Sequence, residues 1–348
     1  MPMVVVKYKI VYNINSVISQ SNQCCYYKRF DQKRAMNFPF FPTFRKLVPE
    51  DRDDYLAVYK HVDPYSDFSF NNLIIWLDLE EDLEISQYKG CVILRFTNPF
   101  EHSRRETAYT ILGYEHCLEV IEAIFAYQAQ QHIPQKLIMV PESVISNALQ
   151  SPTIPQEFVI RASQDHCDYV FTVDEVLTAQ GGNYEQLRRN LRIFYRENPG
   201  QVDVVNLDLA KTETHEYLLE ALTKWQKNAG FIKNDPTFDE PRALNRYFTY
   251  PKACPAECRA FLLNGDIFGF SIIHKPPQKD WAIFNHLKCT RDVPNGYDFI
   301  YHYILGELAK DGISKVNFEQ DLGIPGLRNH KHQLGRSEFL YRYDISRQ

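Results

Sequence analysis

The stretch RAFLLNGDIFGFSIIHK, residues 259–275, predicts the β-hairpin around which the second half of the chain is organised. Its two apolar runs are joined by Asn264-Gly265, and Asn-Gly between alternating hydrophobic residues is the strongest short signal for a hairpin turn. A third strand at 281–290, a turn and helix at 294–313, and a last strand at 315–319 follow. The sequence therefore predicts a sheet in which the last two strands are connected through a helix.

The residues before the hairpin also mix helix and strand patterns. Pro49-Glu50-Asp51 opens an amphipathic helix, and its acidic residues suit the positive end of the helix dipole. The elements expected next are strands at 89–98, 108–114 and 136–141 and helices at 118–133 and 142–149. Beyond a connection at 150–165, the patterns predict helices at 173–178, 184–196, 214–230 and 240–247 and a strand at 203–209. This alternation predicts a mixed α/β fold rather than separate layers of one type.

The length of 348 residues is about twice that of a common single domain, which predicts two domains. We expect an N-terminal extension at 1–35, a first domain at 36–165, and a second domain at 166–348 that carries the main polar site. The extension is expected to be dispensable for the fold, and the alternative is a leading strand that docks on the body.

Composition narrows the class of protein. The net charge of −5 gives no global attraction to nucleic acid or anionic lipid, so a tRNA partner would need a local basic patch. The eight cysteines are scattered rather than arranged as a disulfide framework, which is typical of reduced thiols. No window has the roughly 20 apolar residues of a spanning helix. We therefore expect a cytoplasmic protein without a transmembrane segment.

A cluster of polar residues follows the last predicted strand. Glu319, Gln320 and Asp321 end the strand, and a glycine-punctuated turn leads from them to Arg328 and Lys331. Strand alternation is expected to send the two acids to one face, where they would attract a cation such as a substrate ammonium. Arg328 and Lys331 could hold a phosphate or carboxylate. The alternative is an ion pair of an acid with Arg328 or Lys331 that fixes the turn.

The predicted helix at 184–196 carries the best local phosphate-binding patch. Its candidates are Arg188, Arg189 and Asn190, which lie opposite an apolar stripe. We predict that these residues contact phosphate or tRNA, and a solvated basic face is the alternative.

Two segments resemble one known family. NFEQDLGIPGLRNHK (317–331) and DYVFTVDEVLTAQGGNYEQLRRNLRIF (168–194) resemble, in order and spacing, the signature of the phosphatidylglycerol lysyltransferase C-terminal domain family. The resemblance covers roughly 38–345, and many members of this family have no assigned substrate. It implies two tandem GNAT-like domains, each a mixed, mostly antiparallel sheet flanked by helices.

The same resemblance implies an activity. Named members transfer an aminoacyl group from aminoacyl-tRNA to a lipid headgroup, and they carry a membrane-embedded portion that has no counterpart here. Lys288 matches a lysine of the family, although His286-Leu287-Lys288 replaces the expected Glu-Lys. Lys288 therefore joins the predicted substrate-binding residues, and the acceptor is expected to be a small molecule or a lipid headgroup.

The loop at 291–298 is the expected donor site. Acyl-CoA-dependent GNAT enzymes use a glycine-rich loop at a helix N-terminus to bind pyrophosphate. Here Arg291, Asn295, Gly296 and Tyr297 are the candidate donor contacts, but the loop has one glycine, a proline and two acids. We therefore rank aminoacyl-tRNA above acyl-CoA as the donor.

The sequence does not identify a general base, which acyl transfer needs to take the acceptor's proton. His286, Tyr297 and Tyr301 are weak candidates, and no metal site is predicted because Cys254 and Cys258 lack a second close pair. Two alternatives remain open at this point. One is a non-catalytic GNAT-like module that binds a cationic small molecule or peptide, and the other is an acyl-CoA-dependent N-acetyltransferase.

Overall fold

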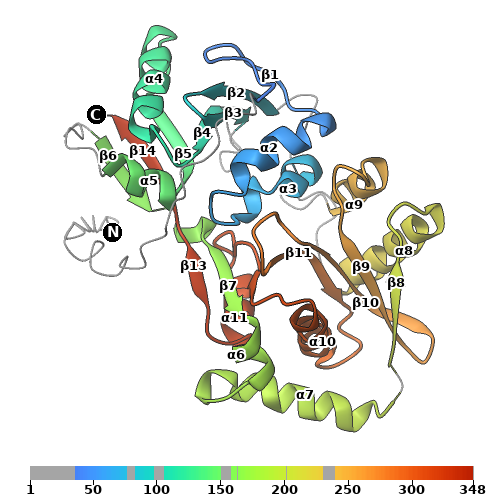
Figure 1. The fold of residues 1–348 in the computed structure, drawn as a ribbon. Coiled ribbons are helices and arrows are strands. Elements are labelled where there is room, and N and C mark those ends of the chain that lie inside the picture. Colours follow the sequence, from blue (N-terminus) through green and yellow to red (C-terminus); the bar gives the residue numbers. More distant parts are fainter. Residues whose placement is uncertain are drawn as a thin grey trace, which may run out of the picture. The chain divides into compact units, whose positions relative to one another are not determined.

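The predicted hairpin lies in a seven-stranded sheet with the order β13-β7-β12-β11-β10-β9-β8 (Figure 1). The strands of this sheet are β7 (Asp168–Thr172), β8 (Val202–Leu207), β9 (Glu257–Leu263), β10 (Asp266–His274), β11 (Trp281–Cys289), β12 (Lys315–Asn317) and β13 (Glu338–Leu340). Asn264 and Gly265 connect β9 to β10 with φ angles of 55° and 88°, as a tight hairpin turn requires. The hairpin prediction is confirmed.

The computed structural model describes residues 36–76, 83–97, 106–149, 158–162, 164–200, 202–229 and 240–347. These ranges belong to one unit, Met36–Gln348. The extension expected at 1–35 lies outside the described residues. Among the residues that are described, no helix combines the length and the apolar character needed to cross a membrane.

β11 and β12 are parallel neighbours that separate after a short ladder. Trp281 pairs with Lys315, and the last pair is Ile283 with Asn317. β11 then continues to Cys289, whereas the chain after Asn317 leaves the strand conformation. The strand expected at 315–319 is therefore shorter by two residues, and the backbone pairing of β11 with β12 has a gap beyond Ile283 and Asn317.

Helices pack on both faces of this sheet. One face packs in a common core with α6 (Val173–Thr178), α7 (Glu185–Glu197) and α10 (Gly296–Lys310). The other face packs with α3 (Phe70–Trp76), α8 (Thr212–Ala229) and α9 (Glu240–Thr249). Because α3 comes from the first half of the chain, the second core is shared between the two halves.

The first half contributes two smaller sheets, with orders β1-β2-β3-β4 and β5-β14-β6. Their strands are β1 (Arg45–Lys46), β2 (Leu83–Tyr88), β3 (Cys91–Thr97), β4 (Thr107–Leu112), β5 (Lys136–Pro141), β6 (Phe158–Ala162) and β14 (Arg342–Arg347). The helices of this half, besides α3, are α2 (Arg52–Tyr59), α4 (Cys117–Gln130) and α5 (Glu142–Leu149), and α11 (Pro325–Gln333) precedes β13. Short 3-10 helices lie at Pro49–Asp51, Ser66–Phe68, Gln164–His166 and Gly182–Tyr184.

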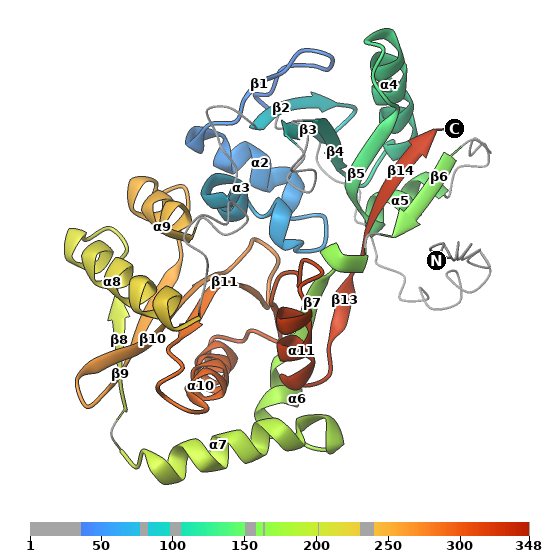
Figure 2. The ribbon, with the colours of Figure 1, turned by 180° about the vertical axis from the view of Figure 1, so that it is seen from behind.

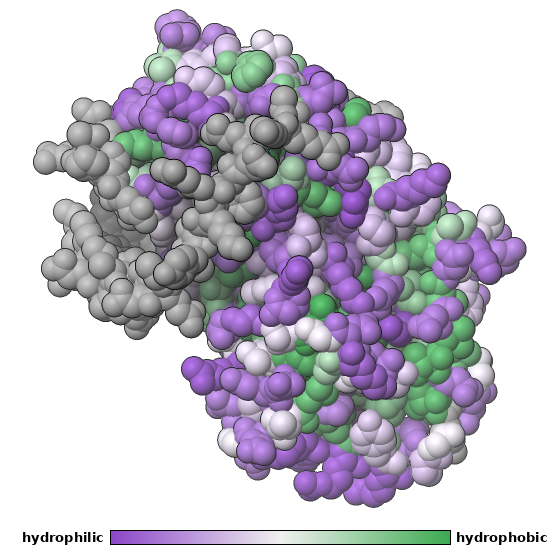
Figure 3. Space-filling model, in the orientation of Figure 1, coloured by the Kyte–Doolittle hydropathy of each residue, from purple (hydrophilic) through white to green (hydrophobic). Residues whose placement is uncertain are grey.

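The last strand of the chain, β14, lies between β5 and β6 and is antiparallel to both (Figure 2). The end of the chain therefore completes a sheet of the first half. Together the sheets and helices form a mixed α/β fold with mostly antiparallel sheets flanked by helices, as the sequence predicted. On the face seen in Figure 3, hydrophilic residues are interspersed with smaller hydrophobic patches.

Candidate functional site

A β-bulge in β11 places one polar side chain at the gap between β11 and β12. Ile272 pairs with His286 and Ile273 with Phe284, so Asn285 has no partner opposite it on β10. A bulge adds one residue to a strand and redirects the side chains around it. Asn285 thereby points towards the residues of α3 and the chain after β12.

Glu319 faces Asn285 across this gap. Each residue lies two positions beyond the last ladder pair, and Asn285 Nδ2 donates to Glu319 Oε1 over 3.4 Å. Asn72 Nδ2, from α3, donates to the same oxygen at 2.8 Å. Within the described part of the chain, Glu319 Oε2 accepts no hydrogen bond. Burial raises the pKa of Glu319 to about 8, against the lowering effects of Asn72 and Lys331.

Lys331, on α11, holds the backbone that carries Glu319. Its Nζ donates to the carbonyl oxygens of Phe318, Glu319 and Gln320, the last two at 2.8 and 2.6 Å. An ammonium has three donors, so all of them are used. These bonds support a turn in which Glu319 has a φ of 58°, a costly backbone conformation for a residue with a side chain. Burial lowers the pKa of Lys331 to about 8. A direct substrate contact would require Lys331 to release one of these carbonyls.

Asp321 forms an ion pair with Arg328. Arg328 Nε and Nη2 donate to the two carboxylate oxygens of Asp321 at 2.7 and 2.8 Å, and Tyr169 Oη donates at 2.6 Å. Burial would raise the pKa of Asp321, but hydrogen bonds from Arg328 and Tyr169 outweigh it and lower the pKa to about 2. The expectation that the acids at 319 and 321 share one face is wrong, because the strand ends at Asn317 and Glu319 has a positive φ. The ion pair that the sequence left as an alternative describes Asp321.

Gln320 points into a buried network between the two halves of the chain. Its Nε2 donates to Asp67 Oδ2 at 2.6 Å and to Asp168 Oδ1 at 3.2 Å. Arg342 Nη2, from β14, lies 2.7 Å from the same oxygen of Asp168, and both side chains of this ion pair are 0% exposed. Gln320 therefore links the end of β12 to the first half.

Lys288 belongs to a separate charged cluster on β11. Its Nζ donates to Glu240 Oε1 at 2.7 Å and lies 4.4 Å from the ring centre of Trp225. Glu240 Oε2 lies 2.8 Å from Nδ1 of the buried His286. Burial would raise the pKa of Glu240, but its interactions with Lys288 and His286 outweigh this effect and lower the pKa to about 2. The structure thus places Lys288 beside an anion rather than beside Glu319.

The three residues of the predicted phosphate-binding patch on α7 differ in their contacts. Arg188 donates to the backbone carbonyls of Ala179 and Gly181, and Asn190 Nδ2 donates to Asp298 Oδ2 at 2.7 Å. Arg189 is exposed and makes no side-chain hydrogen bond within the described residues. Of the three candidates, Arg189 has its guanidinium free for an incoming anion.

The predicted donor loop ends at the N-terminus of α10. Gly296 is buried, and a Cβ placed there would lie 2.8 Å from Cys289 Sγ and 3.1 Å from Phe268. The glycine is therefore required for the packing of α10 on the sheet. Asn295 precedes it with a φ of 60°, and Arg291 is exposed. Burial raises the pKa of Tyr297, whose ring lies edge-on to His330 at 4.2 Å.

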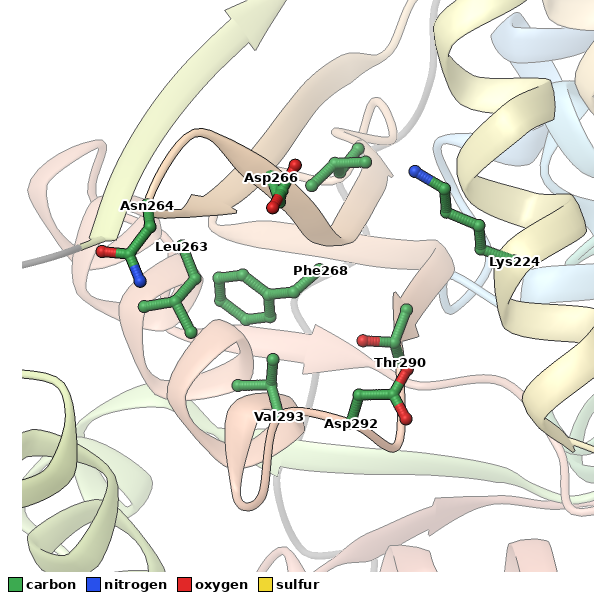
Figure 4. A pocket seen from close by; sticks show the side chains of 9 residues that line it. Lys224, Leu263, Asn264, Asp266, Phe268, Thr290, Asp292 and Val293 are labelled. Carbon is green, nitrogen blue, oxygen red and sulfur yellow. The ribbon is translucent and has the colours of Figure 1, made fainter.

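A hollow of about 500 Å³ lies beside this loop (Figure 4). Lys224 reaches towards it from α8, while Asp266 and Asp292 contribute two acids and Phe268 and Val293 contribute apolar surface. The hollow thus combines one cation with two anions around an apolar wall, which does not match the charge of a pyrophosphate cradle.

Sequence reasoning missed several residues that organise this region. Asn72 lies in an apolar helix and Asn285 in an apolar strand, so a buried amide within a hydrophobic run was the available signal. Asp168 begins one of the two segments that resemble the family, but no local pattern links it to Arg342. Burial also raises the pKa of Tyr301, one of the three weak candidates for the base.

The comparisons with known proteins agree with this fold. The family described as "Phosphatidylglycerol lysyltransferase, C-terminal" matches residues 113–334. A conserved protein of unknown function from Bacteroides thetaiotaomicron is similar with a TM-score of 0.74 and 19% identity, over 88% of this chain and 99% of that chain. The C-terminal domain of a putative lysylphosphatidylglycerol synthetase from Agrobacterium fabrum has a TM-score of 0.60 and 11% identity, over 86% and 93%.

The L-PGS from Bacillus licheniformis is also similar, with a TM-score of 0.59 and 13% identity, over 87% of this chain and 93% of that chain. At these identities the structural likenesses show a shared fold. No curated protein sequence matches the chain. The family match covers more than half of the sequence, and the chain therefore belongs to the phosphatidylglycerol lysyltransferase C-terminal family.

Proposed function

We propose that this protein transfers an aminoacyl group, and that Glu319 holds an ammonium of the transferred residue. The observation that carries the proposal is the carboxylate at the gap between β11 and β12, where one oxygen is held by Asn72 and Asn285 and the other has no described partner. Every aminoacyl group carries an α-ammonium, and a lysyl group carries a second. A cation beside a partly buried carboxylate favours its charged form.

The gap itself suits acyl transfer. Beyond Ile283, the edge of β11 that faces β12 has no ladder partner in the described residues. Backbone N–H groups on such an edge are free to donate to a carbonyl oxygen, and donors aimed at a developing oxyanion stabilise the transition state of acyl transfer. A donor ester placed beside Glu319 would therefore meet both a cation-binding group and hydrogen-bond donors.

The surroundings of α10 favour aminoacyl-tRNA over acyl-CoA as the donor. Asp298 lies in the first turn of α10, and Asn190 donates to it at 2.7 Å. An acid at this end of the helix occupies the position that an anionic pyrophosphate would use. The glycine of the loop serves packing, so the loop offers little to a CoA pyrophosphate. The exposed Arg189 on α7 is the proposed contact for tRNA phosphate.

The remaining parts of the proposal follow the family. We propose a lipid headgroup or a small molecule as the acceptor, and tandem GNAT-like domains at 36–165 and 166–348, of which the second contributes β14 to a sheet of the first. We assign to four neighbouring residues the role of holding Glu319 in place, because the side chain of each forms hydrogen bonds with other protein groups near Glu319. These residues are Gln320, Asp321, Arg328 and Lys331.

A thermal-shift panel tests the ammonium site. Lysinamide resembles a lysyl ester without its tRNA, and at 100 times its Kd a ligand stabilises the folded state by about 2.7 kcal/mol. We expect lysinamide to raise the Tm of the wild type but not of Glu319→Gln, and acetyl-CoA to leave it unchanged. Glu338→Gln is the matched control, because Glu338 forms an exposed pair with Lys315. A shift with acetyl-CoA alone would reverse the order of donors.

A transfer assay separates the enzyme from a binding module. Lysyl-tRNA with labelled lysine is incubated with vesicles of phosphatidylglycerol, and the label that enters the lipid is counted. Transfer that is lost in Glu319→Gln and kept in Glu338→Gln supports the proposal. Lysinamide binding without transfer to any acceptor would instead support a non-catalytic module that binds a cation.

A further inference from the structure

The bulge in β11 places His286 beside the candidate site. A bulge interrupts the alternation of side chains between the two faces of a strand. Asn285 contacts Asn72 of α3, and the next residue, His286, has its ring centre 5.5 Å from that of Trp76 on the same helix. Two consecutive side chains of β11 thus face α3. Because consecutive Cα atoms are about 3.8 Å apart, His286 is a near neighbour of the Asn285 amide that donates to Glu319.

Glu240, the first residue of α9, determines which nitrogen of His286 carries a hydrogen. Glu240 Oε2 lies 2.8 Å from His286 Nδ1, and Lys288 Nζ donates to the other carboxylate oxygen at 2.7 Å. Burial would raise the pKa of Glu240, but Lys288 and His286 lower it to about 2, so the carboxylate is charged. A bare Nδ1 would set its lone pair against this anion, so Nδ1 carries a hydrogen. In the neutral ring, Nε2 is therefore the acceptor.

Nε2 of His286 is buried and has no hydrogen-bond partner among the described residues. The same holds, in that part of the chain, for the hydroxyl of Tyr247, whose ring centre lies 6.0 Å from that of His286. Burial raises the pKa of Tyr247, and charges that include Glu319 and Glu240 raise it further. Both carboxylates therefore act on this region. A buried polar atom without a partner calls for an explanation, and a substrate group that donates to Nε2 provides one.

We propose that His286 is the general base of acyl transfer, and that its Nε2 takes the proton of the acceptor as the acceptor attacks the aminoacyl ester held at Glu319. The inference rests on the proposed aminoacyl transfer and adds the base that the sequence did not identify. An imidazole whose second nitrogen is fixed by a carboxylate is well suited to this task, because its free nitrogen is ready to accept a proton.

Nε2 carries a single proton from the acceptor to the leaving group. As the acceptor oxygen or nitrogen bonds to the carbonyl carbon of the ester, its proton moves to Nε2. His286 becomes an imidazolium that the carboxylate of Glu240 stabilises. The tetrahedral intermediate then breaks its bond to the tRNA oxygen, and that oxygen takes the proton from Nε2. His286 returns to its neutral form, so the step needs no further reactant.

The first test asks which nitrogen of His286 is protonated in the ligand-free protein at pH 8. Two-bond ¹H–¹⁵N correlations distinguish a protonated ring nitrogen from a bare one, and the signals of His286 are assigned by their loss in His286→Gln. If that variant does not fold, they are assigned by their shift in Glu240→Gln. We expect a protonated Nδ1 and a bare Nε2. A bare Nδ1, or hydrogens on both nitrogens, overturns the proposal.

The second test measures the transfer of labelled lysine from lysyl-tRNA to phosphatidylglycerol vesicles. We expect His286→Gln to lower kcat by about 10²- to 10⁴-fold and to change the KM for lysyl-tRNA by less than about twofold. Glu240→Gln should lower kcat by about tenfold or more, because a neutral amide stabilises the imidazolium less. The control is His302→Gln, which should keep its kcat, because His302 is half-buried on α10, on the other face of the sheet.

The outcomes separate the base from the function on which it rests. Transfer by the wild type that His286→Gln retains overturns the role of base and leaves the proposed function in place. A higher KM with an unchanged kcat assigns His286 to binding and also overturns it. No transfer by the wild type overturns the function and this role together. If His286→Gln does not fold, an unchanged kcat in Glu240→Gln overturns the proposal.

Discussion

Replacing Arg342 with methionine should destabilise the protein strongly, because it leaves a buried carboxylate without its cation. Arg342 and Asp168 are each 0% exposed, and Arg342 Nη2 lies 2.7 Å from Asp168 Oδ1. Removal of one partner of a buried ion pair typically costs about 3–5 kcal/mol. Ser66 and Asn317 still donate to Asp168 in the variant, at 2.7–2.8 Å, so we expect a loss of about 3 kcal/mol.

The assay is equilibrium unfolding in urea at pH 7, followed by tryptophan fluorescence. Arg347→Met is the matched control on the same strand, since Arg347 forms a 2.6 Å pair with Glu122 and is 23% exposed. Its loss should cost about 1 kcal/mol, from a partly screened pair and a cation–π contact. The reasoning is refuted if Arg342→Met costs no more than Arg347→Met.

The pH dependence gives an internal check on the cause. Burial would raise the pKa of Asp168, but Arg342 and the hydrogen bonds outweigh it and hold the pKa below its usual range. Without Arg342 the pKa of Asp168 rises in the folded variant. As the pH falls, the folded variant therefore binds a proton at Asp168 while this residue is still ionised in the unfolded chain, and this proton uptake stabilises the folded variant. The difference between Arg342→Met and wild type should therefore become smaller as the pH falls from 7 to 5.

Three further results are expected. Gly335→Ala should lower the free energy of unfolding in urea by about 2 kcal/mol or more, because φ at Gly335 is 131° and a Cβ there would lie 2.1 Å from the ring of Tyr184. Gly326→Ala is the control and should be neutral or stabilising, because a Cβ at Gly326 would have no such neighbour within 4 Å. The pKa of Glu319 is raised to about 8, so the wild type should lose stability relative to Glu319→Gln as the pH rises from 5 to 8, by at most about 1.4 kcal/mol per pH unit. Parallel curves of unfolding free energy against pH for the two proteins would rule this out. The affinity for lysinamide should rise over the same range by up to about tenfold per unit, since Glu319 must ionise to bind it, and calorimetry showing no change would contradict this.

The parts of the fold that the sequence predicted depend on local signals. The hairpin follows from Asn264-Gly265, because both turn residues need positive φ angles that Asn and Gly adopt readily. The amphipathic helix expected at 184–196 corresponds to α7, Glu185–Glu197, because its apolar stripe repeats with the helical period. The polar cluster after the last predicted strand and the family resemblance at 317–331 both single out Glu319, whose role in binding stays a prediction.

The parts that could not be predicted depend on long-range pairing. The bulge at Asn285 is defined by its register against β10, and a strand sequence does not specify which residue will be extra. Strand alternation predicted the wrong face for the side chain of Glu319. Lys331 binds three backbone carbonyls and holds a turn there, so the backbone at Glu319 does not follow the alternation of a strand. The Asp168–Arg342 pair joins residues 174 positions apart, so no local pattern indicated that they would pair.

Two sets of hydrogen bonds hold the Glu319 carboxylate in place, and both sets include residues from the first half of the chain. Asn72, from α3, holds one carboxylate oxygen, while the next residue, Gln320, is bound to Asp67 and through Asp168 to Arg342 on β14. β14 in turn lies in the sheet with β5 and β6. Loss of Arg342 should therefore weaken ligand binding at Glu319 as well as stability, whereas loss of Arg347 from the same strand should affect stability alone.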